Sequence, residues 1–171
     1  MDTDALLQVT RAIIARVPAC MAITVDADGR ANARVVNVKP LTDAWTVRFA
    51  THRGSRKAGE IERSGQLTLA YQYDPEAAYV TLIGKAVITD DEQFKVANWR
   101  PESNRWYPGG PRDPNVVYVD FTAERIELWS SASAVVPNPT IGLWAAVLVR
   151  EGADWTSLTS WPDPSVRHSV A

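Results

Sequence analysis

The sequence predicts a mainly β domain, either an antiparallel barrel or a sandwich, with short helices packed outside it. Several short runs rich in β-branched and aromatic residues are separated by tight turns, which is typical of antiparallel strands. Few segments carry a helical period, and no internal repeat or linker divides the chain. The length of 171 residues, with 46% hydrophobic and 22% charged residues, fits one domain with its own core.

The first part of the chain predicts two helices and three strands. A helical period near the N-terminus ends at Pro18. Asp28-Gly29 lies between two β-rich runs and indicates a hairpin. Ser55 is a candidate N-cap for the second helix, and Gly65 stands where that helix should end. The predicted elements are a helix at 4–16, strands at 19–25, 31–39 and 45–50, and a helix at 55–65.

The second part predicts more strands, one short helix and a long irregular loop. Gly84 lies inside a long strand, which indicates a bulge or bend. The loop at 101–114 has four prolines and two glycines, and loops of this length are often functional. The other predicted elements are strands at 66–73 and 78–89, a turn at Asp74-Pro75, a helix at 90–99, one long bent strand or two strands at 115–131, a strand or helix at 143–149, and a frayed end at 165–171.

The composition argues against several classes of function. A net charge of −2 and a pI of about 5.7 disfavour a general nucleic-acid binder. One cysteine and two distant histidines, His52 and His168, supply neither a zinc site nor the triad of a serine hydrolase. The glycine motifs of P-loop and Rossmann nucleotide sites do not occur.

The sequence also predicts a cytoplasmic protein that has no membrane partner. Cys20 has no second cysteine with which to form a disulfide, which favours a reducing compartment. The acidic, amphipathic start does not resemble a signal peptide, and no apolar run approaches the roughly 18 residues of a membrane span. Nothing near Cys20 would lower its pKa, so we expect an unreactive thiol.

A turn rich in hydrogen-bond donors follows the predicted strand at 45–50. Thr51, Arg53, Ser55, Arg56 and Lys57 bring three cations and two hydroxyls into seven residues. A phosphate monoester carries close to two charges and several acceptor oxygens, so such a set at a helix N-terminus suits it. The alternative interpretation is a solvated loop and helix start.

The run ARVVNVK forms a second candidate site. On a strand, one face would carry Arg34 and Val36. The other face would carry Val35, Asn37 and Lys39. One face would then pack on the core while the other lines a site through Asn37 and Lys39; the alternative is an edge strand with solvated charges.

The order of these motifs resembles that of the pyridoxamine 5'-phosphate oxidase-like family of flavin-binding split β-barrels. RVVNVK is followed by FAT, SRK, the strand at 66–73 and then YVTLIGKA. The later runs WYPGGPRDP and FTAERIELW are similar to the general-stress-protein branch of the family. The similarity covers residues 5–130, and the ordered series is more specific than any one motif. It implies an antiparallel split β-barrel with flanking short helices, as a single domain over 1–171 with an extension at 131–171.

The resemblance further implies FMN, or another flavin, bound at the interface of a homodimer. The implied cofactor-binding residues are Arg34, Val35, Val36, Asn37, Lys39, Thr51, Ser55, Arg56, Lys57, Tyr79, Trp106 and Trp129. Residues 34–39 match positions at the flavin ring and its phosphate, and residues 51–57 match the phosphate-binding turn. Tyr79 replaces a glutamine that pyridoxamine phosphate oxidases commonly place beside the flavin. Trp106 and Trp129 are candidates for the ring wall of the second subunit, with interface packing as the alternative.

The function that the resemblance implies is an FMN-dependent oxidoreductase of unassigned substrate, working by hydride transfer at the flavin. The family's vitamin enzymes carry a C-terminal R-x-H for their substrate, whereas Arg167 and His168 are adjacent here. This difference argues against oxidation of pyridoxamine phosphate. Two alternatives remain open: a stress protein that sequesters a flavin or a phosphorylated ligand without turnover, and a scaffold whose site has decayed.

Overall fold

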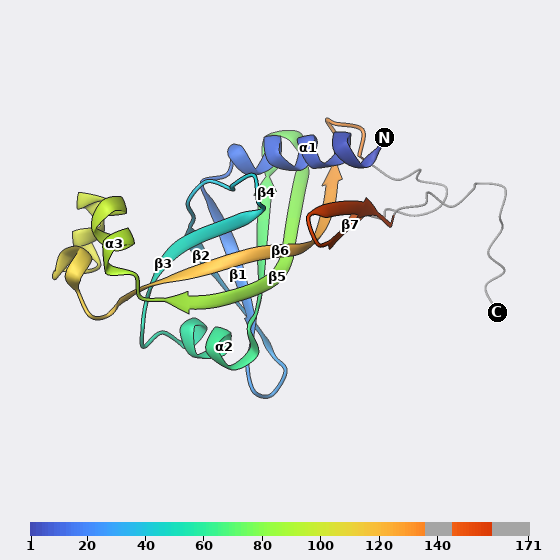
Figure 1. Cartoon of the computed structure of the whole chain (residues 1–171). Helices are drawn as coiled ribbons and strands as arrows, with labels where there is room; N and C mark the ends of the chain where they lie inside the picture. The colour runs from blue at the N-terminus through green and yellow to red at the C-terminus, as the bar shows by residue number, and fades with distance from the viewer. Residues whose placement is uncertain (136–144, 159–171) are drawn as a thin grey trace, which may run out of the picture.

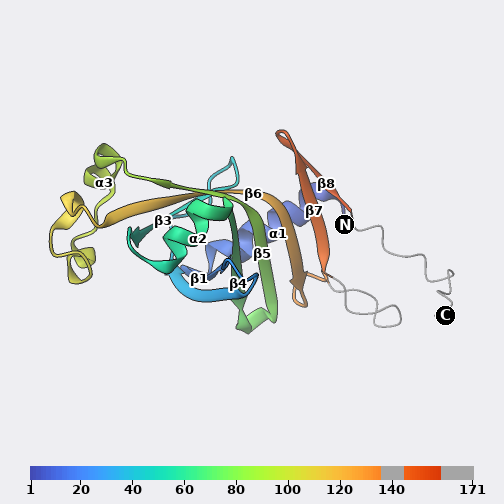
Figure 2. The ribbon, with the colours of Figure 1, turned by 90° about the horizontal axis from the view of Figure 1, so that it is seen from below.

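The computed structural model describes residues 1–135 and 145–158 (Figure 1). An antiparallel sheet forms the body of the molecule. Helices α1 (Thr3–Ala15) and α2 (Arg56–Ser64) lie at opposite ends of its strands (Figure 1). Helix α3 (Glu92–Asn98) and the 3-10 turns η2 (Pro101–Arg105) and η3 (Gly110–Arg112) form an arm that projects beyond β5 and β6 (Figure 2). A third 3-10 turn, η1 (Asp74–Glu76), joins β4 to β5.

The described strands form one sheet that branches at its longest member. They are β1 (Ala19–Val25), β2 (Ala31–Asn37), β3 (Thr46–His52), β4 (Gln66–Tyr73), β5 (Ala78–Thr89), β6 (Val116–Ser130), β7 (Ala146–Glu151) and β8 (Asp154–Ser157). Their order is β2-β1-β4-β5-β6-β7-β8, and β3 pairs with β6 off this path. Strand β6 pairs with β3 along 116–122 and with β7 along 125–128, so it changes partner midway. The predicted mainly β, antiparallel architecture with flanking helices is confirmed.

Local sequence signals explain the ends and bends of the elements that form the candidate site. The Ser55 hydroxyl caps α2 by accepting a hydrogen bond from the Ala58 amide, and Gly65 ends that helix at a φ of 65°, both as predicted. Gly84 marks a shift of register between β5 and β6. A Cβ atom at Gly84 would lie 2.0 Å from the backbone oxygen of Thr122, so only glycine fits this close approach.

Several predicted boundaries differ from the structure. Of the two interpretations of 115–131, the structure shows the single strand β6, and the described part of the run at 143–149 contributes to the strand β7 rather than to a helix. Strand β8 was not predicted, because its four residues are too short to carry a period. The predicted loop at 101–114 contains the turns η2 and η3. The predicted frayed end at 165–171, with Arg167 and His168, lies outside the described residues.

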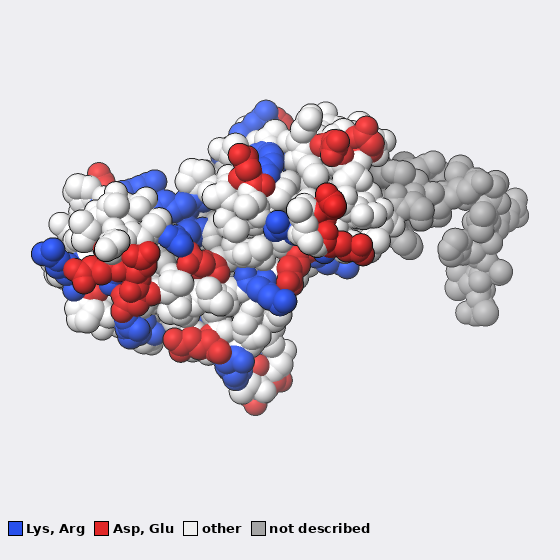
Figure 3. Space-filling view, viewed as in Figure 1, with Lys and Arg blue, Asp and Glu red and all other residues white. Residues whose placement is uncertain are grey.

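The core lies between the sheet and the helices α1 and α2. Its largest fully buried side chains are Tyr71, Phe49, Phe121, Ile13, Ile61, Leu67, Leu69, Leu82, Ile126, Leu128, Leu148 and Val47. On the surface seen in Figure 3, acidic and basic side chains are interspersed over much of the body and the arm. In the part of the chain that the structure describes, none of the helices is both long enough and apolar enough to cross a membrane.

Candidate functional site

The donor-rich turn forms a corner between the end of β3 and the start of α2. Thr51 is buried at the end of β3, and its hydroxyl lies 3.2 Å from that of Ser55. Ser55 is the N-cap of α2, so the amides of Arg56 and Lys57, in the first turn, have no intrahelical acceptor and remain available as donors. The corner therefore combines hydroxyls with the positive end of a helix dipole, as an anion site requires.

Lys57 is the half-buried cation of this corner. Burial lowers the pKa of its ammonium group, and the nearby charge of Arg34 lowers it further. Among the residues that the structure describes, none accepts a hydrogen bond from Lys57 or forms an ion pair with it. A cation in this position gains stability from an added anion, because the anion replaces the water that burial has removed.

Arg34 reaches the same corner from β2. Its side chain is 21% exposed, and Nη2 lies 3.0 Å from Oε2 of Glu60 on α2. Arg56 is 69% exposed at its side chain, and its Nε lies 3.5 Å from the other Glu60 oxygen. The structure thus brings the predicted Arg34 and Arg56 to one carboxylate, which the sequence did not predict.

The faces of β2 follow the predicted alternation. Val36 is buried in the core, while Val35 is 67% exposed and Asn37 is exposed on the opposite face. Strand β2 is also the first strand of the sheet order, so its second edge carries no regular pairing among the described strands. The run therefore has the predicted core face at Val36 and lies at an end of the sheet order, but Arg34 is paired with Glu60 and is not a solvated charge.

A cavity of about 850 Å³ begins where β2 ends. It is lined by Asn37 and Lys39, by residues of α1, and by the η2 region including Arg100 and Trp106. The Nζ atom of Lys39 donates to the backbone oxygen of Asn98 at 3.2 Å. Burial, followed by the charge of Arg100, lowers the pKa of Lys39. Trp106 is 70% exposed, so its ring is available to cover a ligand at this position.

Tyr79 and Trp129 form a separate aromatic pair on β5 and β6. Their rings are stacked, with centroids 6.1 Å apart and planes 8° from parallel. Asn37 on β2 and Tyr79 on β5 are separated by the strands β1 and β4. Three inter-strand spacings correspond to about 14 Å across the sheet. Within one chain, the structure therefore brings Arg34, Ser55, Arg56 and Lys57 together but leaves this pair apart from them.

Two residues of the donor-rich segment point elsewhere. Arg53 forms an ion pair with Asp90, and its Nε donates to the backbone oxygen of Pro114 at 3.1 Å. His52 accepts a hydrogen bond from the Gly54 amide. The prediction that Arg53 contributes to the anion seat is wrong, because its partners lie on the β5–α3 connection and near the start of β6.

Sequence reasoning missed three polar residues that support the corner. Glu60 is buried and accepts hydrogen bonds from Thr24 on β1 and from Asn32 on β2. The one available signal was the spacing of Arg56 and Glu60, four residues apart on a predicted helix. The contacts with β1 and β2 span 36 and 28 residues, and no local pattern predicts them.

Comparison with known proteins supports the predicted resemblance. The family model described as "Pyridoxamine 5'-phosphate oxidase like" matches residues 5–148. General stress protein 26 of Bacillus subtilis (strain 168) is 33% identical over 92 residues, which are 52% of this chain and 65% of that protein. The match thus spans somewhat less than two thirds of the curated relative.

Solved structures with the same fold are similar over most of the chain. PhzG from Burkholderia lata 383, solved with tetrahydrophenazine-1-carboxylic acid, has a TM-score of 0.67 at 21% identity, covering 94% of this chain and 93% of PhzG. A pyridoxamine 5'-phosphate oxidase-related, FMN-binding protein from Nostoc punctiforme PCC 73102 has a TM-score of 0.57 at 16% identity, covering 90% and 92%. At such identities the likeness concerns the fold, and it confirms the predicted split β-barrel.

Proposed function

The chain belongs to the pyridoxamine 5'-phosphate oxidase-like family, and we propose that it binds FMN between two copies of itself and serves as an FMN-dependent oxidoreductase. One family neighbour is named as an FMN-binding protein. The observation that carries the proposal is Lys57, a half-buried cation beside Arg34 at the start of α2. Within the described residues it has no counter-ion.

The corner fits the phosphate end of FMN in both charge and donors. Arg34, Arg56 and Lys57 carry three positive charges, and Glu60 offsets one of them. The remaining two charges match a phosphate monoester, which carries about −1.5 to −2 near pH 7. Thr51, Ser55 and the first amides of α2 add neutral donors. Their hydrogen bonds to an ionised phosphate oxygen would be charge-assisted.

The flavin ring would lie along β2, away from the corner. Asn37 follows Arg34 by three residues, or about 10 Å along a strand. This places the ring beside the exposed backbone edge of β2 and near the cavity at Asn37 and Lys39. When bound, the flavin supplies hydride chemistry, taking two electrons and a proton from a reduced substrate and passing them to an acceptor. The chain's own residues position the ring and exclude water from it.

The second copy would cover an apolar sheet face. Val35 on β2 is paired in register with Met21 on β1, so both side chains lie on the same face. Val25 and Tyr79, on the same face of β1 and β5, are 44% and 39% exposed. We expect the second copy to cover these exposed apolar side chains, because they share one face of the sheet. The stacked pair of Tyr79 and Trp129 would then face the ring held by the partner.

The proposal is tested by titrating the apo protein with FMN while the mass in solution is measured by light scattering. We expect a dimer that binds FMN with a shifted flavin absorption spectrum, and oxidation of reduced nicotinamide only when FMN is present. Val35→Glu should weaken both dimer formation and FMN binding, because it places a charge in the apolar face. Val87→Glu is a matched control, since Val87 is 58% exposed but lies in a groove beside α2.

Each alternative result has a distinct meaning. A protein that stays monomeric would refute the proposed site. So would a dimer whose dissociation constant for FMN lies in the high-micromolar range or above. Tight binding of FMN without turnover of any electron donor would support the site but refute the oxidoreductase function, and would favour sequestration of the flavin.

A further inference from the structure

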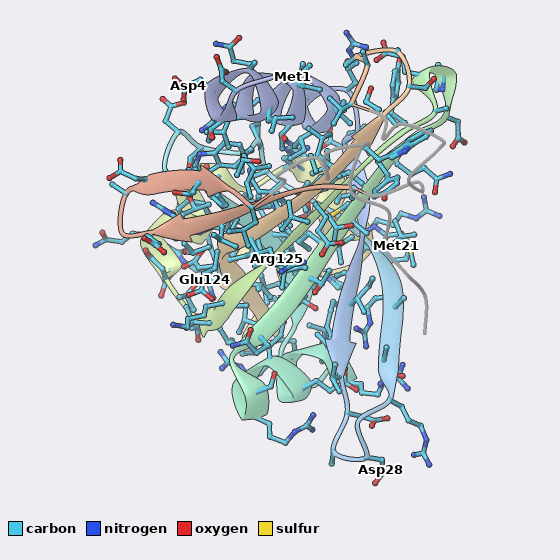
Figure 4. The ribbon with its side chains drawn as sticks, turned by 90° about the vertical axis from the view of Figure 1, so that its right-hand side faces the viewer. Met1, Asp4, Met21, Asp28, Glu124 and Arg125 are labelled. Carbon is cyan, nitrogen blue, oxygen red and sulfur yellow. The ribbon has the colours of Figure 1, made fainter. Side chains whose placement is uncertain are left out.

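Glu60 is the one buried carboxylate in the cationic corner, and the sequence motifs do not account for it. Its side chain is 4% exposed. Its Oε2 accepts hydrogen bonds from Thr24 Oγ1 and from Arg34 Nη2, the latter at 3.0 Å. Its Oε1 accepts a hydrogen bond from Asn32 Nδ2 at 2.9 Å. Arg56 Nε lies 3.5 Å from that second oxygen. These partners come from β1, β2 and α2, and Figure 4 shows the β1–β2 hairpin, with Asp28 at its tip, extending beside α2.

The carboxylate is ionised in this environment. Burial alone would raise the pKa of Glu60, but the hydrogen bonds from Thr24 and Arg34 and the charges of Arg34 and Arg56 outweigh it and lower the pKa. A buried charge is costly unless it is paired and hydrogen-bonded, and it adds little net stability compared with an apolar side chain of the same size. The placement of this charge in the corner therefore points to a role other than stability.

The contacts show what Glu60 does to Arg34. A guanidinium group has five N–H donors. Arg34 uses Nη1 on Thr24 and on the Asn32 backbone oxygen, the latter at 2.7 Å, and uses one Nη2 donor on Glu60. In the part of the chain that the structure describes, the Nε–H and the other Nη2–H have no acceptor. Glu60 supplies the one charged contact among those that fix the guanidinium plane, and the arrangement leaves two donors for a ligand.

We propose that Glu60 is the positioning residue of the anion seat: it holds Arg34, and through it sets the affinity for the phosphate group of the ligand. This inference rests on the proposed function, since it assumes that the corner receives the phosphate of FMN. It adds that the affinity depends on a residue that does not itself touch the phosphate. It also makes the seat one of net charge two rather than three, matched to a phosphate dianion.

The test compares FMN with riboflavin, which lacks the phosphate, on the full chain. Glu60→Gln keeps the shape of the side chain but replaces the ionised acceptor of Arg34 with a neutral one, which weakens the contact that orients the guanidinium group. We expect the FMN dissociation constant to rise about tenfold, as for a lost charge-assisted contact, while riboflavin affinity stays unchanged. Glu62→Gln is the matched control, because Glu62 is exposed on the same helix, and it should change neither affinity.

A double-mutant cycle separates positioning from a general structural role. In an Arg34→Met background, Glu60→Gln should change FMN affinity by less than about twofold, because the group through which Glu60 acts is gone. If Glu60→Gln does not fold, Asn32→Leu removes the side-chain donor to the other Glu60 oxygen while Arg34 keeps its acceptors on Thr24 and the backbone of residue 32, and it should weaken FMN binding about threefold, again without an effect on riboflavin.

The outcomes distinguish this inference from the proposed function. Suppose that the wild-type protein binds FMN. If Glu60→Gln then lowers the affinities for FMN and riboflavin by the same factor, or changes neither affinity, the role of Glu60 alone is overturned. An equal effect of Glu60→Gln with and without Arg34 would also overturn it. Wild-type protein that does not bind FMN would refute the proposed function and this inference together.

Discussion

Replacing Lys57 with methionine tests whether the corner binds a phosphate group. Lys57 is half-buried at the start of α2 with no described counter-ion, so a bound phosphate would be its charged partner. Hydrogen bonds to charged groups contribute about 1.5–3 kcal/mol. A half-buried pair lies near the middle of this range, and about 2 kcal/mol corresponds to about 30-fold in the dissociation constant.

The assay is calorimetric titration of the apo protein with FMN and, separately, with riboflavin. We expect Lys57→Met to weaken FMN binding about 30-fold and to leave riboflavin binding unchanged. Lys85→Met is the matched control, because Lys85 is 69% exposed and paired with Glu124 on the sheet surface. FMN affinity within about twofold of wild type for Lys57→Met would show that the phosphate does not bind in this corner.

The same variant should change the stability of the apo protein in the opposite direction. Because burial and Arg34 lower the pKa of Lys57, the folded state disfavours its proton relative to the unfolded chain. The charged lysine thus costs stability at neutral pH, and the cost is relieved as pH rises through its folded pKa towards its unfolded value. We expect apo Lys57→Met to melt at a higher temperature than wild type at pH 7, with the difference narrowing at alkaline pH. A lower melting temperature at pH 7 would contradict this electrostatic account.

Two further predictions concern the core and the sheet. Burial raises the pKa of Cys20 to about 11, so its thiol should resist alkylation by iodoacetamide at pH 8 in the folded protein. The thiol should react once denaturant is added, and fast alkylation under native conditions would contradict its burial. Gly84→Ala should lower the free energy of unfolding by about 1–3 kcal/mol in denaturant titrations, since a Cβ there would overlap the backbone oxygen of Thr122, and an unchanged midpoint would show that β6 moves aside at little cost.

The parts of the site that the sequence predicted are those decided by local chemistry. Helix α2 starts at Ser55 because an N-cap favours a short polar side chain, and it ends at Gly65 because the left-handed backbone conformation there favours glycine. The two faces of β2 follow from the period of a strand, which puts Val36 inside and Val35 outside. Such features depend on a few neighbouring residues, and a single sequence carries them.

The parts that the sequence did not predict depend on pairings across the fold. Arg53 and Arg56 are equivalent as residue types, yet Arg53 pairs with Asp90, 37 residues later, and leaves the corner. Glu60 meets Asn32 and Thr24 only because α2 packs against the β1–β2 hairpin. Which cation of a cluster is free for a ligand is therefore a property of the tertiary structure, even when the cluster itself is visible in the sequence.

The geometry of one chain also gives a reason why the proposed ligand would need two copies of the chain. The corner can hold a phosphate, but beside it the edge strand β2 presents an exposed Val35 and an open backbone edge, which shields a flat ring on one side only. Hydride chemistry is favoured where water is excluded from both faces of the ring. A ligand that contacts two copies binds the dimer more tightly than the monomer, so FMN affinity and dimer formation would be thermodynamically linked. Weakening the apolar face far from the phosphate corner should then lower FMN affinity, even though no residue of the corner has changed.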